Sequence, residues 1–363
     1  MIARLEAVEL LRVRLPLRRP FRTSFGTMAE KEAILVRALG DDGTEGWGEC
    51  VAAQQPLYSE EWNEAAWLIL RDVLVPAALA GRGATVRGHP MSRAALSTAL
   101  LDLDLRQRRV GLAAHLGGVR DRVPCGVSLG IEERLDDLLG EVARFIDGGY
   151  RRVKLKIEPG RDVEVVRHVR DAFPHVPLSV DANAAYGPED AEHLAALDEF
   201  DLEYLEQPLP QEHLLGHAEL QRRLRTPVCL DETIISATVA AEAIRLGACR
   251  VINIKLGRVG GLEEAVTIHD IATAAGVPVW CGGMLETGIG RAANVALASL
   301  PGFTLPGDTS ASDRYFPFDL TDPFVVDGDG TMAVPDGPGL GVVPVSELLG
   351  RVTVERTTIT RPG

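Results

Sequence analysis

Five charged residues close apolar, strand-like runs at nearly equal steps along the chain. They are Lys156, Asp181, Glu206, Asp231 and Lys255, and the steps between them are 25, 25, 25 and 24 residues. A step of this length accommodates one strand followed by one helix. Because the carboxyl ends of the strands of a parallel barrel meet at one rim, we expect these five side chains to share a site.

The first of these runs carries two lysines. Residues 151–157 read Arg-Arg-Val-Lys-Leu-Lys-Ile, so Lys154 and Lys156 should point to the same face of a buried strand. Two like charges on one buried face disfavour each other, which lowers the pKa of a lysine and makes a neutral amine available as a base. The pattern therefore also predicts anionic groups opposite these lysines.

Three acids provide such groups. Asp181, Glu206 and Asp231 would converge from three neighbouring strands and offer hard oxygen ligands. This donor set favours Mg²⁺, with Mn²⁺ or another divalent cation as the alternative. A network in which lysines neutralise the acids is the competing interpretation. Asn183 and Asn253 share faces with members of this set, so each either orients a site residue or is a hydrogen-bonded buried amide.

Lysines on opposite sides of a bound cation can each reach one face of a carbon whose carboxylate binds the metal. We therefore expect Lys156 and Lys255 to remove and return the proton at that carbon. The α-proton of a carboxylate is very weakly acidic, so the resulting enediolate needs divalent charge and cationic hydrogen bonds. Lys154 either assists or is only a counter-ion.

Composition restricts the class of partner. The chain has 363 residues, of which 46% are hydrophobic, and a formal net charge of −14. This charge argues against nucleic acid and anionic membrane surfaces, and a small anionic carboxylate substrate would need local lysines and a cation to offset it. Without a membrane-spanning run or a secretory signal, the expected location is the cytoplasm. Five widely spaced cysteines predict reduced core thiols.

The pattern of elements changes near residue 123. Before it, we predict a strand, a loop, a hairpin and two helices at residues 1–16, 20–27, 33–50, 60–80 and 90–109. After it, strands and helices alternate, and eight strands begin near Pro124, Arg152, Leu178, Leu202, Pro227, Val251, Pro278 and Phe303. Eight parallel strands close a barrel. The expected domains are an α+β cap at 1–120, a barrel at 121–310 and a tail at 311–363 that packs on the cap.

The motifs around these residues resemble the enolase superfamily. Within it, they are most similar to the o-succinylbenzoate synthase and N-acylamino acid racemase group. The motifs are Lys154-Leu-Lys156, Asp181-Ala-Asn183, Glu206-Gln-Pro, Asp231-Glu, Asn253-Ile-Lys255 and Gly282-Gly-Met-Leu-Glu286-Thr-Gly-Ile-Gly-Arg-Ala-Ala-Asn294. The resemblance extends over almost the whole chain. It implies an α/β fold with a TIM-like (β/α)7β barrel and an α+β capping domain built from the N-terminal region and the C-terminal tail.

The resemblance also implies roles for individual residues. The implied metal ligands are Asp181, Glu206 and Asp231, and the implied acid/base pair is Lys156 and Lys255 with Lys154 assisting. Further implied substrate contacts are Gly282, Met284 and, in a loop that closes over the substrate, Phe21 and Ser24. We also expect a homo-oligomer. The segment Leu96–Arg109 departs from the family pattern because it lacks an expected tryptophan, which concerns cap packing and assembly.

Two reactions are implied by the resemblance, and both pass through one enediolate. One is dehydration of 2-succinyl-6-hydroxy-2,4-cyclohexadiene-1-carboxylate to o-succinylbenzoate in menaquinone synthesis. The other is racemisation of N-succinyl or other N-acyl amino acids. The sequence leaves open which of them is physiological.

Other classes of function compete with this interpretation. Gly126-Val-Ser128-Leu-Gly130 matches the nucleophile elbow of serine hydrolases, with His269 as a nominal partner. Lys255 is also a candidate Schiff-base lysine of an aldolase in the same barrel. A non-catalytic sugar- or acid-binding protein is a third alternative, but binding alone would not require two lysines of lowered pKa, such as Lys156 and Lys255, across a cation.

Overall fold

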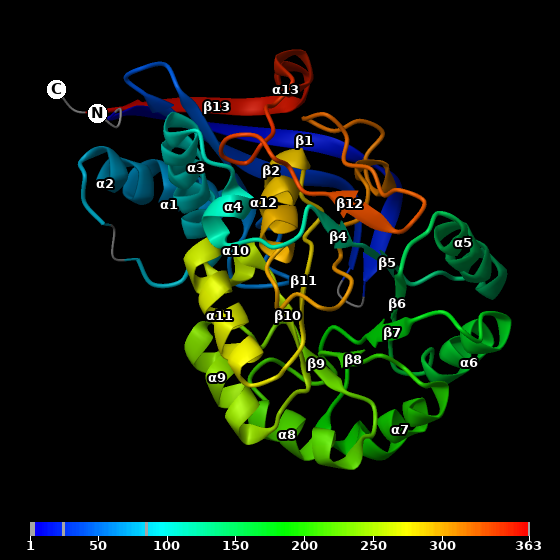
Figure 1. Ribbon diagram of the computed structural model, residues 1–363. Helices are drawn as coiled ribbons and strands as arrows, with labels where there is room; N and C mark the ends of the chain where they lie inside the picture. The colour runs from blue at the N-terminus through cyan, green and yellow to red at the C-terminus, as the bar shows by residue number, and fades with distance from the viewer. Residues whose placement is uncertain (1–3, 24–25, 84–85, 362–363) are drawn as a thin grey trace.

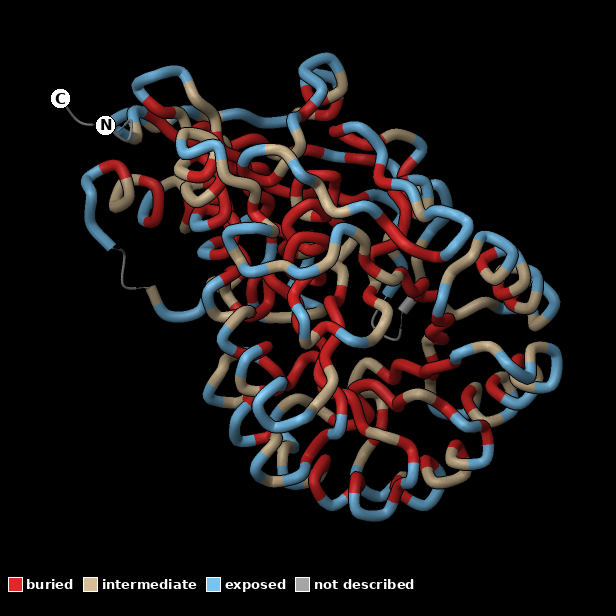
Figure 2. The backbone as a smooth tube through the Cα atoms, viewed as in Figure 1, coloured by how far each residue is buried: buried red, intermediate tan, exposed pale blue. Residues whose placement is uncertain are grey.

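Seven parallel strands form a curled sheet with helices on its outer face (Figure 1). The computed structural model describes residues 4–23, 26–83 and 86–361. The strand order is β11-β10-β9-β8-β7-β6-β5, so each strand lies beside its neighbour in the sequence. The strands are β5 (Gly126–Leu129), β6 (Arg152–Lys156), β7 (Leu178–Asp181), β8 (Leu205–Glu206), β9 (Val228–Leu230), β10 (Val251–Ile254) and β11 (Val279–Cys281). Figure 2 shows that the strand segments are buried.

The eighth predicted strand is present only as isolated bridges. Phe303 pairs in parallel with Val279 on β11, and Gly307 pairs with Cys125 beside β5, so this segment connects the two edges of the curled sheet. Pro301 and Pro306 have no N–H to donate to a continuous ladder, which accounts for the interruption. The predicted barrel is confirmed with this irregular eighth segment.

Helices alternate with the strands of the barrel. They are α5 (Leu135–Asp147), α6 (Val163–Ala172), α7 (Ala191–Ala195), α8 (Leu214–Arg223), α9 (Ala237–Leu246), α10 (Leu256–Val259), α11 (Leu262–Ala274) and α12 (Gly288–Ala298), with short 3₁₀ turns η2 (Pro188–Asp190), η3 (Ala196–Phe200) and η4 (Ser312–Arg314). Within the described ranges, none of the helices has the length and apolar character that a membrane span requires. All five cysteines are buried free thiols, as expected.

An antiparallel sheet with the order β13-β1-β2-β3 covers one end of the barrel. Its strands are β1 (Leu5–Thr23), β2 (Gly26–Gly40), β3 (Glu45–Cys50) and β13 (Thr353–Thr360). The accompanying helices are α1 (Asn63–Ile69), α2 (Val75–Leu79), α3 (Pro90–Arg108), α4 (Leu112–Leu116) and α13 (Ser346–Val352), and a π-helical turn η1 (Leu70–Leu74) joins α1 to α2. A small ribbon pairs β4 (Arg122–Pro124) with β12 (Thr331–Ala333).

The loop predicted at residues 20–27 is wrong in its extent. Strands β1 and β2 continue as one hairpin, in which Phe21 pairs with Met28 and Arg22 pairs with Thr27. The irregularity lies between Pro16 and Phe21, where the register shifts. Proline has no N–H to donate to the ladder. The pairing of β1 with β2 is therefore interrupted near Pro16 and Pro20 and not at the segment that contains Gly26.

Glycines in β3 allow helix α3 to pack directly on the cap sheet. A Cβ atom would lie 2.2 Å from the carbonyl oxygen of Ala99 at Gly46, and 2.0 Å from that of Ala95 at Gly48. Glu49, near the end of the same strand, contacts the barrel. Its carboxylate accepts hydrogen bonds from Thr287 and Gly290 at the start of α12. Burial of this carboxylate raises the pKa of Glu49 to about 6. Strand β3 therefore joins the cap to the barrel.

Candidate active site at the carboxyl rim of the barrel

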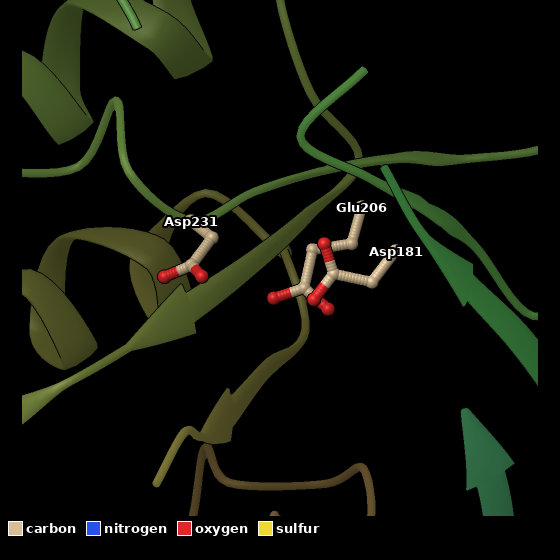
Figure 3. A group of neighbouring side chains, drawn as sticks. All are labelled: Asp181, Glu206 and Asp231. Atoms are coloured by element: carbon tan, nitrogen blue, oxygen red, sulfur yellow. The ribbon is translucent and has the colours of Figure 1, made fainter. Parts of the chain in front are cut away.

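Three carboxylates converge where neighbouring strands end (Figure 3). Asp181 ends β7, Glu206 ends β8 and Asp231 directly follows β9. One oxygen from each side chain lies within 4.8 Å of the other two, and all three residues are buried. Three hard oxygen donors at this spacing fit a divalent cation such as Mg²⁺ and leave further positions for substrate or water. The structure thus brings together the three acids that the equal steps single out.

Lys154 contacts the carboxylate cluster directly. Its Nζ lies 2.6 Å from Glu206 Oε2, 2.9 Å from Asp308 Oδ2 and 3.4 Å from Asp181 Oδ2. Burial acts to lower the pKa of Lys154, but these carboxylates outweigh it and raise the pKa well above its ordinary value. The prediction of a lowered pKa is therefore wrong for Lys154, because the acids act more strongly than the neighbouring lysine.

Lys156 is the residue of β6 that pairs with Asp181 on β7. Its Nζ donates to Asp181 Oδ2 at 2.6 Å and to Asn183 Oδ1 at 2.5 Å. The Asn183 backbone N–H donates to Asp181 Oδ1 at 2.9 Å, and its amide donates to Glu232 Oε1 at 2.9 Å. Burial would raise the pKa of Asp181, but Lys156 and Lys154 hold it below its ordinary value. Asn183 thus orients both a lysine and an acid.

Lys255 approaches the cluster from the other side. It follows β10, and its Nζ donates to Asp231 Oδ2 at 2.8 Å and to the Tyr58 hydroxyl at 3.2 Å. Burial acts to lower the pKa of Lys255, but Tyr58, Glu232 and Glu206 outweigh it and raise the pKa. The predicted lowering of the pKa is therefore wrong here too. Because β6 and β10 flank the three acid-bearing strands, Lys156 and Lys255 lie on opposite sides of the carboxylates.

Asn253 lies next to Glu206 in the barrel interior. Its amide donates to Glu206 Oε1 at 2.8 Å. Of the two roles considered for Asn253, this contact fits the orientation of a site residue. Gly282 packs against the same amide. A Cβ atom at Gly282 would lie 2.2 Å from Asn253 Oδ1 and 2.7 Å from Lys255 Cγ, so only glycine fits there without displacing one of them.

Three residues at this rim were not predicted. Asp308 binds Lys154 and, at 2.8 Å, Arg152; these cations outweigh burial and hold the pKa of Asp308 below its ordinary value. Arg258 donates to Asp231 from α10, and Glu232 accepts from Asn183. Asp308 follows the eighth apolar segment just as the other acids follow theirs, so the strand-end rule would have found it.

A cavity of about 280 Å³ adjoins the rim, between the barrel and the cap. Lys156 and Lys255 line its barrel side, with Met284 nearby, and Phe21 lines it from the β1–β2 hairpin. Phe21 packs edge-on against Tyr315, with the ring centroids 6.1 Å apart. The two lysines therefore share a partly open cavity to which both the barrel and the cap contribute.

One of the four predicted substrate contacts, Gly282, is placed elsewhere. Gly282 is not among the described residues that line the cavity; it packs behind them against Asn253. Ser24 lies outside the described residues.

The nucleophile elbow at Ser128 is wrong. Ser128 is buried on β5, and its Oγ has no hydrogen-bond partner among the described residues. His269 lies on α11, where one ring nitrogen is 2.8 Å from Asp270 and the other accepts from the Gly302 N–H at 2.9 Å. The structure therefore does not bring serine and histidine together.

The fold and this rim are those of the enolase type of metal enzyme, and two family models match the chain accordingly. "Enolase C-terminal domain-like" matches residues 137–348, and "Mandelate racemase / muconate lactonizing enzyme, N-terminal domain" matches residues 6–117. The chain belongs to the enolase superfamily, whose members use a divalent metal.

Similar curated proteins indicate which group within the superfamily the chain resembles. The N-succinylamino acid racemase of an Amycolatopsis species is 56% identical, with 98% of this chain and 99% of the relative covered. The o-succinylbenzoate synthase of Geobacillus kaustophilus is 49% identical, with 94% of each covered. A solved structure of an enolase superfamily member from Listeria innocua has a TM-score of 0.94 and 36% identity, covering 99% of this chain and 100% of that one. The resemblance to the synthase and racemase group is confirmed.

Proposed function

We propose that this protein removes the proton α to a substrate carboxylate with the help of a divalent cation, as an o-succinylbenzoate synthase, an N-succinylamino acid racemase or both. The observation that carries this proposal is the placement of Lys156 and Lys255 on strands that flank the three acids, with both lysines lining one cavity. A substrate α-carbon between them has a proton-transfer group on each face.

Different residues of the site would bind the metal, transfer the proton and hold the acids in position. Asp181, Glu206 and Asp231 would hold Mg²⁺ or Mn²⁺, which would supply positive charge to the substrate carboxylate. It would also offset the carboxylate charge that raises the pKa values of Lys154 and Lys255. Lys156 and Lys255 exchange the proton, and Lys154 fixes Glu206 and Asp181 in place. For dehydration, one lysine acts as the base and the other stabilises the anionic intermediate as a cation.

The relatives' activities support both reactions. Their printed names are N-succinylamino acid racemase and o-succinylbenzoate synthase, and each relative is matched over more than nine tenths of its length. We include a role in menaquinone synthesis, a cytoplasmic location and a homo-oligomeric state in the proposal. The domain limits at 1–120, 121–310 and 311–363 are likewise part of it.

The purified protein with Mg²⁺ should convert the cyclohexadiene precursor to o-succinylbenzoate, or racemise N-succinyl amino acids, or do both. Ultraviolet absorbance follows the first reaction and polarimetry follows the second. Chelation should stop both reactions, and added Mg²⁺ should restore them. Absence of both reactions, together with a borohydride-trapped adduct on Lys255 in the presence of a keto acid, would replace this proposal with the aldolase.

Substitution of Gly282 by alanine should lower kcat by about 100-fold, because the new Cβ atom displaces Asn253 or Lys255 and a shift near 1 Å at a reacting group has an effect of this order. The matched control is Gly140→Ala on α5, where a Cβ atom would meet nothing within 4 Å. This control should keep wild-type kcat and be more stable by roughly 0.4–1 kcal/mol. Wild-type kcat in Gly282→Ala would show that the close packing does not position Lys255.

A further inference from the structure

The distribution of lysine in this chain is unusual. Lys31, Lys154, Lys156 and Lys255 are its four lysines, in a total of 38 lysines and arginines. Three of them contact the acids at the barrel rim. The fourth, Lys31, lies on β2 of the cap and lines the same cavity as Lys156 and Lys255. Arginine supplies the positive charge elsewhere, so lysine is confined to the site and its cavity.

Lys31 is buried, with 3% of its surface exposed. Its Nζ donates to the carbonyl oxygens of Met284 at 3.0 Å and Val51 at 3.3 Å. An ammonium group has three N–H donors, so one remains after these two bonds. Among the described residues, no carboxylate lies within 4.0 Å of this Nζ. Lys31 is therefore a buried cation with a donor to spare.

The nearest acids are occupied by other partners. Glu49 accepts from the backbone of Thr287 and Gly290, and Glu286 accepts from the Met284 N–H at 2.9 Å. Burial lowers the pKa of Lys31, and the charges of Glu49 and Glu286 only partly offset this effect. A buried charge without a close partner is costly, so an additional anion near Lys31 would be stabilising.

The charge of the cavity lining is complementary to an anionic ligand. Its charged residues, within the described ranges, are Lys31, Lys156 and Lys255, and no acid is among them. Much of the remaining lining is apolar, including Phe21 and Leu57. A cavity with cations from both the barrel and the cap, and with an otherwise uncharged lining, suits an apolar or amide-linked molecule with a carboxylate at each end.

We propose that Lys31 binds the second carboxylate of the substrate, remote from the carbon whose proton is removed, and so selects acyl groups that end in an acid. The inference rests on the proposed function and makes it more specific. The substrate class is a dicarboxylate in which one acid lies at the metal rim and the other lies several bonds away. For an N-acyl amino acid, the second acid is the end of the acyl chain. Lys31 is then a specificity residue that touches the substrate without taking part in proton transfer.

The test compares an N-succinyl amino acid with the N-butanoyl derivative of the same amino acid, which has similar length and no second carboxylate. Lys31→Met should raise KM for the N-succinyl substrate by about 10- to 100-fold, the range expected for a charged hydrogen bond, and leave KM for the N-butanoyl substrate unchanged. Lys31→Arg keeps the charge and should preserve the preference for N-succinyl. Arg14→Met is the control, because it removes a half-exposed cation of the same sheet whose partner is Glu32; both KM values should stay as in the wild type.

An equal rise in KM for both substrates in Lys31→Met would overturn the proposal and leave Lys31 as a positioning residue for the Val51 and Met284 backbone. If Lys31→Met does not fold, inhibition of the wild type decides: succinate-terminated inhibitors should bind at least about 10-fold more tightly than butanoyl ones, and equal binding overturns the proposal. Failure of the proposed function has a different signature, because the wild type would then turn over neither the cyclohexadiene precursor nor either acyl substrate.

Discussion

Replacing either Lys156 or Lys255 by alanine should abolish racemisation, with a loss of at least about 1,000-fold in kcat. Each enantiomer must be deprotonated by the lysine on one face and reprotonated by the lysine on the other. The two residues lie on strands that flank the acids, so neither can reach the face of its counterpart. Polarimetry of a single enantiomer, with thermal unfolding as the check on folding, measures this effect.

In deuterium oxide, each of the two alanine variants should exchange the α-proton of one enantiomer only, and the enantiomer should differ between the variants. Lys255→Ala should still exchange the enantiomer whose proton faces Lys156, and leave its mirror image untouched. Lys156→Ala should do the reverse. The contrast is Lys154→Met, which removes a cation that contacts Glu206 and does not line the cavity; it should slow both enantiomers alike. Equal exchange of both enantiomers in either alanine variant would mean that another group moves the proton.

Removing one charge from the acid cluster should be equally damaging. Asp181→Asn, Glu206→Gln and Asp231→Asn each keep the shape of the side chain and remove a charge that a divalent cation requires. We expect turnover to fall at least about 1,000-fold and Mg²⁺ affinity, measured by calorimetry, to fall with it. Folding should be nearly intact, because the Asn and Gln side chains keep an oxygen that accepts a hydrogen bond. The lysines at the cluster also keep other partners: Asp308 for Lys154, Asn183 for Lys156 and Tyr58 for Lys255.

Glu232→Gln is the matched control for the cluster. Glu232 is a buried acid that follows Asp231 directly, but its contact is with the amide of Asn183 and it is outside the group of three converging oxygens. Its substitution should leave Mg²⁺ affinity close to that of the wild type. Full turnover after exhaustive chelation would show that the cluster has no metal role.

The regular steps in the sequence predicted the barrel and the meeting of Asp181, Glu206 and Asp231, because a parallel sheet converts equal spacing along the chain into proximity at one rim. The same rule places Lys156 and Lys255 on opposite sides. It did not predict the direction of the lysine pKa shifts, since that depends on the balance between burial and several acids at distances of 2.6–3.4 Å.

Contributions from the cap were harder to predict. Lys31 lies on a strand remote in sequence from every barrel motif, and its place in the cavity depends on how the β1–β2 hairpin lies over the rim. The extent of that hairpin was itself wrong, because a glycine-containing segment with a nearby proline reads as a loop. Periodicity describes the repeating unit of a barrel, and it carries no information on a side chain that enters the site from outside the repeat.

Pairing of β13 with β1 has a consequence for biosynthesis. Strand β1 is flanked by β2 on one side and by β13 on the other, and β13 is translated after the entire barrel. During synthesis, one edge of β1 therefore has its backbone N–H and C=O groups unpaired until β13 arrives. An unpaired edge of this kind is a template for association with other chains. We expect nascent or truncated chains without β13 to depend on chaperones, even when the barrel itself has formed.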